Sequence, residues 1–175
     1  YRTSRSHNAV RLDLPDRWTP SLARLIGFIV AEGHVISRED NTGDVRVTNS
    51  DDEILTDVVQ AFEALGLNCT LDEPREGTTA SRVRCNASEF VSFLERLEPS
   101  LLERSADQRV PDAVLTASET TKREFLRAYV DAEGHVSTSQ RELTVASMSR
   151  ELLAGVRSLL LCFEIRSTIE RRENG

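Results

Sequence analysis

The sequence predicts an α+β fold with antiparallel sheets, built from two similar units. The first observation is a repeat, because the pentapeptide Ala-Glu-Gly-His-Val occurs at residues 31–35 and again at 132–136. The second is that segments with helical spacing and segments with strand-like alternation follow each copy in the same order. The third is that capping and turn residues separate these segments and mark their boundaries.

The similarity of the two units extends beyond the pentapeptide. Further pairs of segments align, namely 45–48 with 143–146, 53–55 with 151–153, and 67–71 with 165–169. Because these pairs keep their order, they indicate a duplicated unit and not a chance match. We therefore expect an N-terminal segment (1–18), a first unit (19–98), a connector (99–118) and a second unit (119–175). The second unit lacks a fourth strand and a last helix, so we expect an excerpt from a longer polypeptide.

The first unit is expected to begin with a helix. Thr19 supplies a capping hydroxyl and Pro20 occupies the first helical position, while Gly33 is expected to end the helix in a left-handed conformation. The elements predicted after it are a hairpin (strands 34–38 and 45–49, turn 41–44), a helix (54–65), two strands (68–72 and 81–85) and a closing helix (90–97).

The second unit repeats this order as far as it extends. Thr121 and Glu124 have the spacing of a capping box for its first helix, which Gly134 ends. The elements predicted after this helix are a hairpin (strands 135–139 and 142–148), a helix (150–163) and a strand (165–171). The connector contains Pro111 and is predicted to hold at most one short helical turn.

The charge of the chain is informative about its partners. A net charge of -7 and a pI near 5.1, taken alone, argue against a nucleic-acid partner. Lys122 is the only lysine, however, and all other Lys+Arg positions are arginine. Arginine binds phosphates and guanine edges through paired hydrogen bonds, so a few arginines on one face suffice for DNA binding. An acidic, lysine-poor surface also fits the salt-rich cytoplasm of a salt-adapted archaeon.

Other features favour a cytoplasmic protein without a membrane partner. No apolar run approaches the length of a membrane span, and residues 1–8 are polar and lack a signal-peptide pattern. The three cysteines, Cys69, Cys85 and Cys162, show no metal-binding spacing and lie among apolar residues. We therefore expect all three to be buried, reduced thiols.

Small residues share one face of each opening helix. They are Gly27 and Ala31 in the first unit and Ala128 and Ala132 in the second. This spacing lets the two helix backbones pack closely, so Glu32 and Glu133, the next residues, should lie side by side at the helix ends. Two such carboxylates repel each other unless cations lie between them, and their hard oxygen ligands suit Mg²⁺.

Residues 25–33 (LIGFIVAEG) and 126–134 (LRAYVDAEG) resemble the two motifs of the LAGLIDADG homing endonucleases, a family found within introns and inteins. The resemblance covers about residues 19–172. It implies a monomer of two αββαββα units about a pseudo-twofold axis, whose sheets form a saddle over the major groove of double-stranded DNA. It also implies that Glu32 and Glu133, with Gly33 and Gly134 in the same metal site, hold Mg²⁺ or Mn²⁺ and cut both strands with 3′ overhangs.

The resemblance assigns one further catalytic residue and shows two departures. In the family, a basic residue on the strand before the closing helix assists the activated water, and Arg84 matches that position. Lysine is common there, and an always-charged guanidinium is a poorer proton acceptor. Ala128 replaces the first motif glycine, a small change that still permits close packing. His34 and His135 follow the glutamates, and because Mg²⁺ does not prefer imidazole, we favour a polar position near DNA over a catalytic role.

Strand alternation indicates which residues face DNA. With Val45 and Val47 toward the helices, Arg46 and Thr48 face outward, as Arg82 does on its own strand. The expected DNA-binding residues are Arg38, Arg46, Thr48, Arg82, Arg84, Thr144, Arg166, Thr168 and Arg171. The alternative is that these are ordinary solvated strands, because alternation alone shows only which side is wet.

The sequence therefore favours a metal-dependent, site-specific double-strand DNA endonuclease, the nuclease insert of an intein whose splicing domain lies elsewhere in the parent chain. An intron-encoded enzyme is the near alternative. A non-cleaving LAGLIDADG-type binding module is the rival from another class, and retention of both Glu32 and Glu133 counts against it. A decayed endonuclease that only supports a splicing domain is a third possibility.

Overall fold

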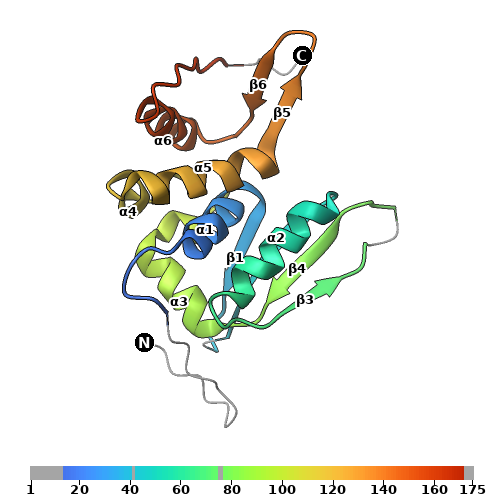
Figure 1. Cartoon of the computed structure of the whole chain (residues 1–175). Helices are drawn as coiled ribbons and strands as arrows, with labels where there is room; N and C mark the ends of the chain where they lie inside the picture. The colour runs from blue at the N-terminus through green and yellow to red at the C-terminus, as the bar shows by residue number, and fades with distance from the viewer. Residues whose placement is uncertain (1–13, 41, 75–76, 172–175) are drawn as a thin grey trace.

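The computed structural model describes residues 14–40, 42–74 and 77–171, which form an α+β fold with two antiparallel sheets (Figure 1). The predicted fold class is confirmed. In chain order the elements are α1 (Pro20–Glu32), β1 (Gly33–Ser37), β2 (Gly43–Asn49), α2 (Asp52–Glu63), β3 (Cys69–Asp72), β4 (Ser81–Cys85), α3 (Ser88–Leu97), the 3₁₀ helix η1 (Pro99–Leu102), α4 (Asp112–Leu115), α5 (Glu119–Glu133), β5 (Gly134–Ser137), β6 (Glu142–Val145) and α6 (Arg150–Leu161).

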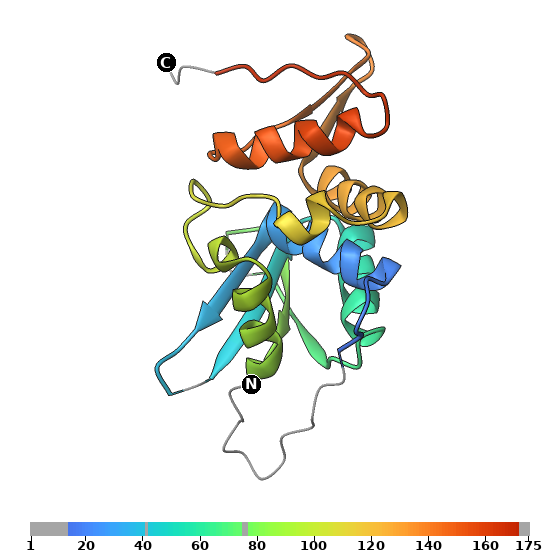
Figure 2. The ribbon, with the colours of Figure 1, turned by 90° about the vertical axis from the view of Figure 1, so that its left-hand side faces the viewer.

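The first unit is a four-stranded sheet with helices on one face. Its strand order is β1-β2-β4-β3, and all neighbouring strands are antiparallel. The helices α1, α2 and α3 pack on the sheet (Figure 2). The inward residues Val45, Val47, Val83 and Cys85 are completely buried, as the alternation of apolar residues predicts. The intervening side chains lie on the open face of the sheet.

Two first-unit boundaries differ from the predictions. The hairpin turn is shorter than predicted, because Gly43 and Asp44 already pair with Ser37 and Ile36 and so belong to β2. Gly33 was expected in the left-handed region, but its φ is -86° and its ψ is 153°. Glycine is required there for another reason: a Cβ atom on Gly33 would lie 2.3 Å from the carbonyl oxygen of Ile29.

Local capping explains where the long helices begin. Thr19 Oγ1 accepts a hydrogen bond from the Leu22 backbone N–H at 3.2 Å, as predicted for α1. The predicted capping box at the start of α5 is wrong. Ser118 is the N-cap, because its Oγ accepts from the Thr121 N–H at 3.4 Å. Glu124 instead lies 3.6 Å from Arg24 of α1, so it bridges the two long helices.

The α1 and α5 helices form the centre of the molecule and join its two units (Figure 1). They pack closely at Gly27, where a Cβ atom would lie 2.5 Å from the Phe125 carbonyl oxygen and 2.9 Å from the Ala128 Cβ. Ala128 is completely buried, whereas Ala31 and Ala132 are partly buried against the same core. A backbone contact this close is possible only with small residues at the crossing.

The second unit is less complete than the first within the described residues. Its sheet contains only β5 and β6, and α6 packs against α5 and α4. The predicted strand at 165–171 is wrong, because residues 165–171 form no regular element. In the first unit the corresponding strand, β3, pairs only with β4. The described part of the second unit has no counterpart of β4, so a strand at 165–171 would lack a hydrogen-bonding neighbour.

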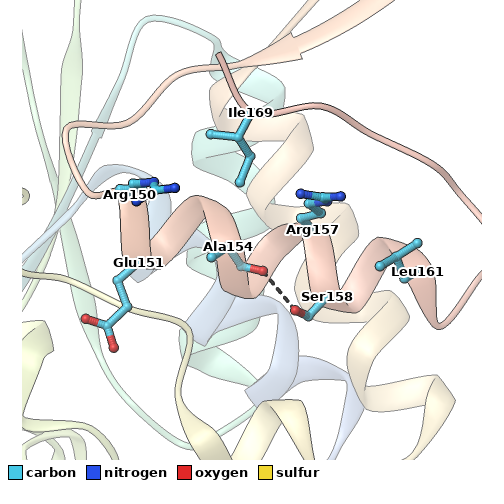
Figure 3. A pocket seen from close by; sticks show the side chains of 7 residues that line it. All are labelled: Arg150, Glu151, Ala154, Arg157, Ser158, Leu161 and Ile169. Carbon is cyan, nitrogen blue, oxygen red and sulfur yellow. Dashed lines mark hydrogen bonds between the residues drawn. The ribbon is translucent and has the colours of Figure 1, made fainter. Parts of the chain in front are cut away.

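The segment 165–171 lies over α6 instead. Figure 3 shows Ile169 across an open groove from one side of α6, with Arg150 and Arg157 on that side of the helix. The apolar face of the β5–β6 hairpin is left uncovered, since Val136 and Leu143 are 66% and 51% exposed. Their first-unit counterparts, Val35 and Val45, are buried. The helix–hairpin–helix order is therefore the same in the two units, but the hairpin is buried against a core in the first unit and exposed in the second.

The connector fixes the end of the first unit against the second. Arg109 Nε donates to Glu98 Oε2 at 2.9 Å, and Glu98 is almost completely buried. The Ser149 hydroxyl, which caps α6, also donates to the backbone carbonyl of Gln108 at 2.6 Å.

Of the cysteines predicted to be buried, Cys85 is buried and Cys69 is half-buried, but Cys162 is exposed at the end of α6. None of the helices in the described part of the chain combines the length and the hydropathy that a membrane crossing requires.

Candidate functional site

The two motif glutamates are the last residues of the two central helices. Glu32 ends α1 and Glu133 ends α5, and each is followed by a glycine that begins a strand. The glycine backbone N–H continues the helical pattern, because Gly33 donates to Ile29 and Gly134 to Val130. This leaves each glutamate at a helix C-terminus, where the helix dipole disfavours a negative charge.

The two carboxylates lie in a shared electrostatic environment. Burial among the packed helix ends raises the pKa of Glu32 from 4.5 to about 7, and the negative charge of Glu133 contributes in the same direction. Burial also raises the pKa of Glu133. The Glu32 side chain nevertheless remains solvent-accessible. The arrangement is a pair of partly desolvated carboxylates that water can reach, in which the charge of Glu133 opposes ionisation of Glu32.

Nothing in the described residues compensates this charge. No hydrogen bond or ion pair to either carboxylate is formed within residues 14–40, 42–74 and 77–171. The described residues also contain no cluster of three or more His, Cys, Asp or Glu side chains that could enclose a metal ion. A pair of carboxylates without a cage fits Mg²⁺ or Mn²⁺ better than zinc, because Mg²⁺ keeps several waters and binds through one or two carboxylates plus substrate phosphates.

Tyr129 lies one helical turn before Glu133 and was not singled out from the sequence. Its side chain is 1% exposed, and its hydroxyl is buried with no hydrogen-bond partner among the described residues. Burial and the charge of Glu133 both raise its pKa. The equivalent residue of α1 is Phe28, so the two helices differ by one hydroxyl at this buried position. A tyrosine at an apolar helix position is the sequence feature that could have identified it.

The open face of the first sheet brings together residues predicted to contact DNA. The register places His34, Arg46, Arg84 and Thr70 in one row across the four strands. In the next row, Thr48 and Asp72 lie on either side of Arg82. Arg84 is two strands away from His34, about 10 Å along the hydrogen-bonding direction. Arg84 therefore lies two strands away from β1, the strand that follows Glu32, and not beside the Glu32 carboxylate.

Aspartates hold several of these arginines in place, and the sequence analysis did not identify them. Asp44 is 2% exposed and accepts hydrogen bonds from Arg38 and from Arg46 Nε. Burial alone would raise the pKa of Asp44, but the hydrogen bonds from the two arginines outweigh it and keep the pKa below its usual value. Asp72 accepts from Arg84 Nη2 at 3.5 Å, while Arg84 Nε is buried and has no partner within residues 14–40, 42–74 and 77–171.

The second unit presents fewer of the predicted contacts. Thr144 lies opposite His135 on β5 and β6, at the position that corresponds to Arg46 opposite His34. The other predicted residues of this unit are Arg166, Thr168 and Arg171. All three are exposed, but they lie on the irregular segment over α6 and not on a sheet. The expectation that alternation along a strand 165–171 directs Arg166 and Thr168 to one sheet face is therefore wrong.

The comparison with known families identifies this architecture. Residues 19–98 and 120–175 match the LAGLIDADG-like domain family. The chain belongs to this family. The boundaries of the match enclose both helix–hairpin–helix units and leave out the whole connector (99–118).

Relatives of this LAGLIDADG-like domain occur inside proteins with unrelated names. The chain is 27% identical over 174 residues to a tRNA-splicing ligase RtcB of Pyrococcus horikoshii, and it is 29% identical over 150 residues to the RNA polymerase subunit Rpo1C of Methanocaldococcus jannaschii. The alignments cover 98% and 85% of this chain but only 18% and 16% of the two relatives. The chain thus spans less than a fifth of the length of these curated relatives.

Solved structures share the fold at low sequence identity. The structure of I-DmoI in complex with DNA and Mn superposes with a TM-score of 0.63 at 15% identity, covering 88% of this chain and 83% of that one. Full-length DUF199/WhiA from Thermatoga maritima superposes with a TM-score of 0.61 at 16% identity, covering 87% of this chain and 48% of that one. The fold is therefore found both in a homing endonuclease and in WhiA.

Proposed function

We propose that this LAGLIDADG-like chain is a metal-dependent, site-specific double-strand DNA endonuclease. The observation that carries the proposal is the pair of uncompensated carboxylates, Glu32 and Glu133, at the ends of two closely packed helices. An arrangement that raises a carboxyl pKa to about 7 costs stability and is typical of a functional site. The structural relative I-DmoI has been crystallised with DNA and with Mn, Ca or Mg, which supports a divalent cation here as well.

In this proposal each group has a distinct role. Glu32 and Glu133 hold Mg²⁺ or Mn²⁺, with the backbone of Gly33 and Gly134 in the same site. A bound ion of this kind would activate water and stabilise the charge on the cleaved phosphodiester. The open face of the first sheet binds the duplex, and Arg84 contributes charge to the phosphates rather than accepting a proton, because a guanidinium stays charged. The two units act as one monomer about a pseudo-twofold axis.

We further propose that the domain is the nuclease insert of an intein. Nearly the whole chain aligns with a small part of a tRNA-splicing ligase, of an RNA polymerase and of a DNA gyrase. These proteins have unrelated names and share only this segment with the chain, which is what a mobile inserted domain produces. The partner of the domain is then a splicing domain in the same parent polypeptide. An intron-encoded enzyme predicts the same nuclease without that partner.

The test of cleavage uses a plasmid that carries the uninterrupted insertion site, incubated with the chain and Mg²⁺. We expect linear DNA with staggered 3′ ends, and we expect no cutting by Glu32→Gln or Glu133→Gln. Asp131→Asn is the matched control, because Asp131 is an exposed acid on the same helix, two residues before Glu133. Cutting that persists in both glutamine variants would remove the carboxylate pair from the mechanism.

A non-cleaving DNA-binding module is the second candidate, and two observations favour it. Arginine stands at position 84 where a proton acceptor is useful, and its guanidinium is tied to Asp72. The fold is also that of WhiA. Tight binding to the same plasmid without cutting by the wild-type chain would support this module. Absence of both binding and cutting would support a decayed endonuclease.

The cellular setting is part of the proposal. The net charge of -7 and the single lysine fit a cytoplasm rich in salt, as in a salt-adapted archaeon. High salt screens the mutual repulsion of surface carboxylates, so the free energy of unfolding should rise with KCl concentration. Chemical unfolding at several KCl concentrations measures this dependence. Equal stability in low and high KCl would contradict the salt-adapted setting.

A further inference from the structure

Two of the three cysteines lie directly opposite each other in the sheet of the first unit. The antiparallel register pairs Cys69 of β3 with Cys85 of β4. Both belong to the inward face of the sheet, where Cys85 is completely buried and Cys69 is half-buried and packs against the core. Valines fill the neighbouring inward positions, namely Val45, Val47 and Val83. Two thiols therefore meet where their neighbours are hydrocarbon.

The spacing of this pair is close to that of a disulfide. Residues directly opposite each other on antiparallel strands have Cα atoms about 4.5–5.5 Å apart, within the range of about 4.4–6.8 Å found for disulfides. The Cβ atoms of such a pair are about 4.5–5.5 Å apart, whereas a disulfide needs about 3.5–4.5 Å. A bond between Cys69 and Cys85 thus requires a movement of about 1 Å.

The place of Cys69 in the sheet allows this movement. In the described part of the chain β3 is an edge strand that pairs with β4 alone (Figure 1), and Cys69 is its first residue. Cys85 is held more firmly, because β4 pairs with both β2 and β3. The outer strand can therefore approach the inner one at this end without disturbing a second row of hydrogen bonds.

The two thiols differ in access and in acidity. Burial, with a smaller contribution from the charge of Glu63, raises the pKa of Cys69. Burial, and then the charge of Cys69, raises the pKa of Cys85 to about 12. Both groups are therefore protonated at neutral pH and react slowly, which fits a pair that stays reduced in a cytoplasm at rest. A small oxidant reaches Cys69 first, because Cys85 is completely buried.

We infer that Cys69 and Cys85 are a modification site: under oxidation by a peroxide they join in a disulfide that fastens the edge strand β3 to β4. Hydrogen peroxide first transfers an oxygen to the Cys69 sulfur, which gives a sulfenic acid and water. The Cys85 sulfur then attacks the Cys69 sulfur, the S–O bond breaks, and the departing hydroxide takes the Cys85 proton as a second water. Two thiols and one peroxide thus yield one disulfide and two waters. This inference is independent of the proposed cleavage of DNA.

The test treats the full chain, as a Cys162→Ser variant, with hydrogen peroxide. This variant lacks the exposed thiol at the end of α6, so the remaining thiols are those of Cys69 and Cys85. We expect both free thiols to disappear and the mass of the chain to fall by two hydrogen atoms. Trypsin cuts after Arg82 and Arg84, which lie between the two cysteines in the sequence, so the unreduced digest should contain their peptides joined. Dithiothreitol should restore both thiols.

Thermal unfolding gives a second readout. A bond between Cys69 and Cys85 closes a loop over residues 70–84 and restricts the unfolded chain, so the oxidised protein should melt about 4–12 °C higher than the reduced one. Cys69→Ala in the Cys162→Ser background is the matched control. It keeps Cys85, but it should form no bridge within one molecule and show no rise in melting temperature after peroxide.

Three results would overturn the inference. One is a treated chain in which Cys69 carries a sulfinic acid while Cys85 stays a thiol, because the two sulfurs then do not meet. Another is disulfide formation only between molecules, seen as dimers on a non-reducing gel. The third is survival of both thiols at a peroxide concentration that oxidises Cys162 completely in the wild-type chain. In each case the proposed nuclease function stands, because none of these measurements involves DNA or a metal.

Discussion

The backbone of Gly27 in α1 lies so close to α5 that a Cβ atom there would stand 2.5 Å from the carbonyl oxygen of Phe125. This contact sets the separation of the two helices, and the helices in turn set the separation of Glu32 and Glu133. The crossing is therefore the link between a sequence of small residues and a pair of interacting carboxylates. It also makes the candidate site sensitive to changes well away from the glutamates.

Gly27→Val should destabilise the fold, because its side chain has to push the backbone of α5 away. We expect a loss of about 1–3 kcal/mol in the free energy of unfolding, measured by urea denaturation. Ala154→Val on the exposed side of α6 is the matched control and should cost less than about 1 kcal/mol. A Gly27→Val variant as stable as the wild type would show that the two helices do not pack as described.

The pKa of Glu32 makes the stability of the metal-free chain depend on pH. The pKa is about 4.5 in the unfolded chain and about 7 in the folded one, so the folded state holds the proton more tightly. The contribution of Glu32 to stability should therefore be greatest below pH 4.5, fall as the pH rises toward 7, and change little above pH 7. Because Glu32 is solvent-accessible, the discounted loss is on the order of 1 kcal/mol.

Glu32→Gln should remove this dependence. The variant is expected to be more stable than the wild type at pH 8 in EDTA and equally stable at pH 4, as measured by urea denaturation at each pH. Asp131→Asn provides the control for loss of one negative charge near the end of the neighbouring helix α5. A Glu32→Gln variant that is less stable than the wild type at pH 8 would mean that the carboxylate has a stabilising partner.

The elements that the sequence predicts best are those determined by neighbouring residues. Thr19 and Pro20 define the start of α1, and alternation along β2 and β4 gives the inward and outward faces. The cap of α5 was misassigned because two nearby hydroxyl residues, Ser118 and Thr121, could each cap the helix. In the structure Ser118 does so, by accepting a hydrogen bond from the Thr121 N–H. The strand expected at 165–171 fails because a strand depends on a partner that local sequence does not reveal.

In the candidate site, too, some features follow from neighbouring residues and others depend on partners that are distant in the sequence. Small residues before Glu32 and Glu133 indicate that the two acids lie at the ends of paired helices, and the repeat indicates which acids correspond. The ion pairs of Arg46 with Asp44 and of Arg84 with Asp72 could not be derived in this way. Asp44 reads as a turn residue in the sequence. In the structure it belongs to β2, where it shares a face with Arg46 two residues further on, and the β1–β2 hairpin brings Arg38 to it as well.

Tyr129→Phe tests whether the buried hydroxyl on α5 is a structural liability. The hydroxyl has no hydrogen-bond partner in the part of the chain that the structure describes, and phenylalanine already occupies the equivalent position, Phe28, in α1. Removing an unpaired buried hydroxyl should leave stability unchanged or raise it by about 1–3 kcal/mol, as measured by thermal and urea unfolding. A clear loss of stability would instead reveal a partner for the hydroxyl, such as a buried water.

The ion pair between Glu98 and Arg109 closes the connector, and its two partners are unequally exposed. Glu98 is 2% exposed, whereas the Arg109 side chain is 43% exposed. Among the described residues, Arg109→Ala leaves the buried carboxylate with the Ser100 N–H as its one remaining donor, so we expect a loss of about 2 kcal/mol in urea denaturation at pH 7. The double variant Arg109→Ala/Glu98→Gln removes the unpaired charge and should recover part of this loss. If the double variant is no more stable than Arg109→Ala, the cost comes from lost arginine packing and not from the buried charge.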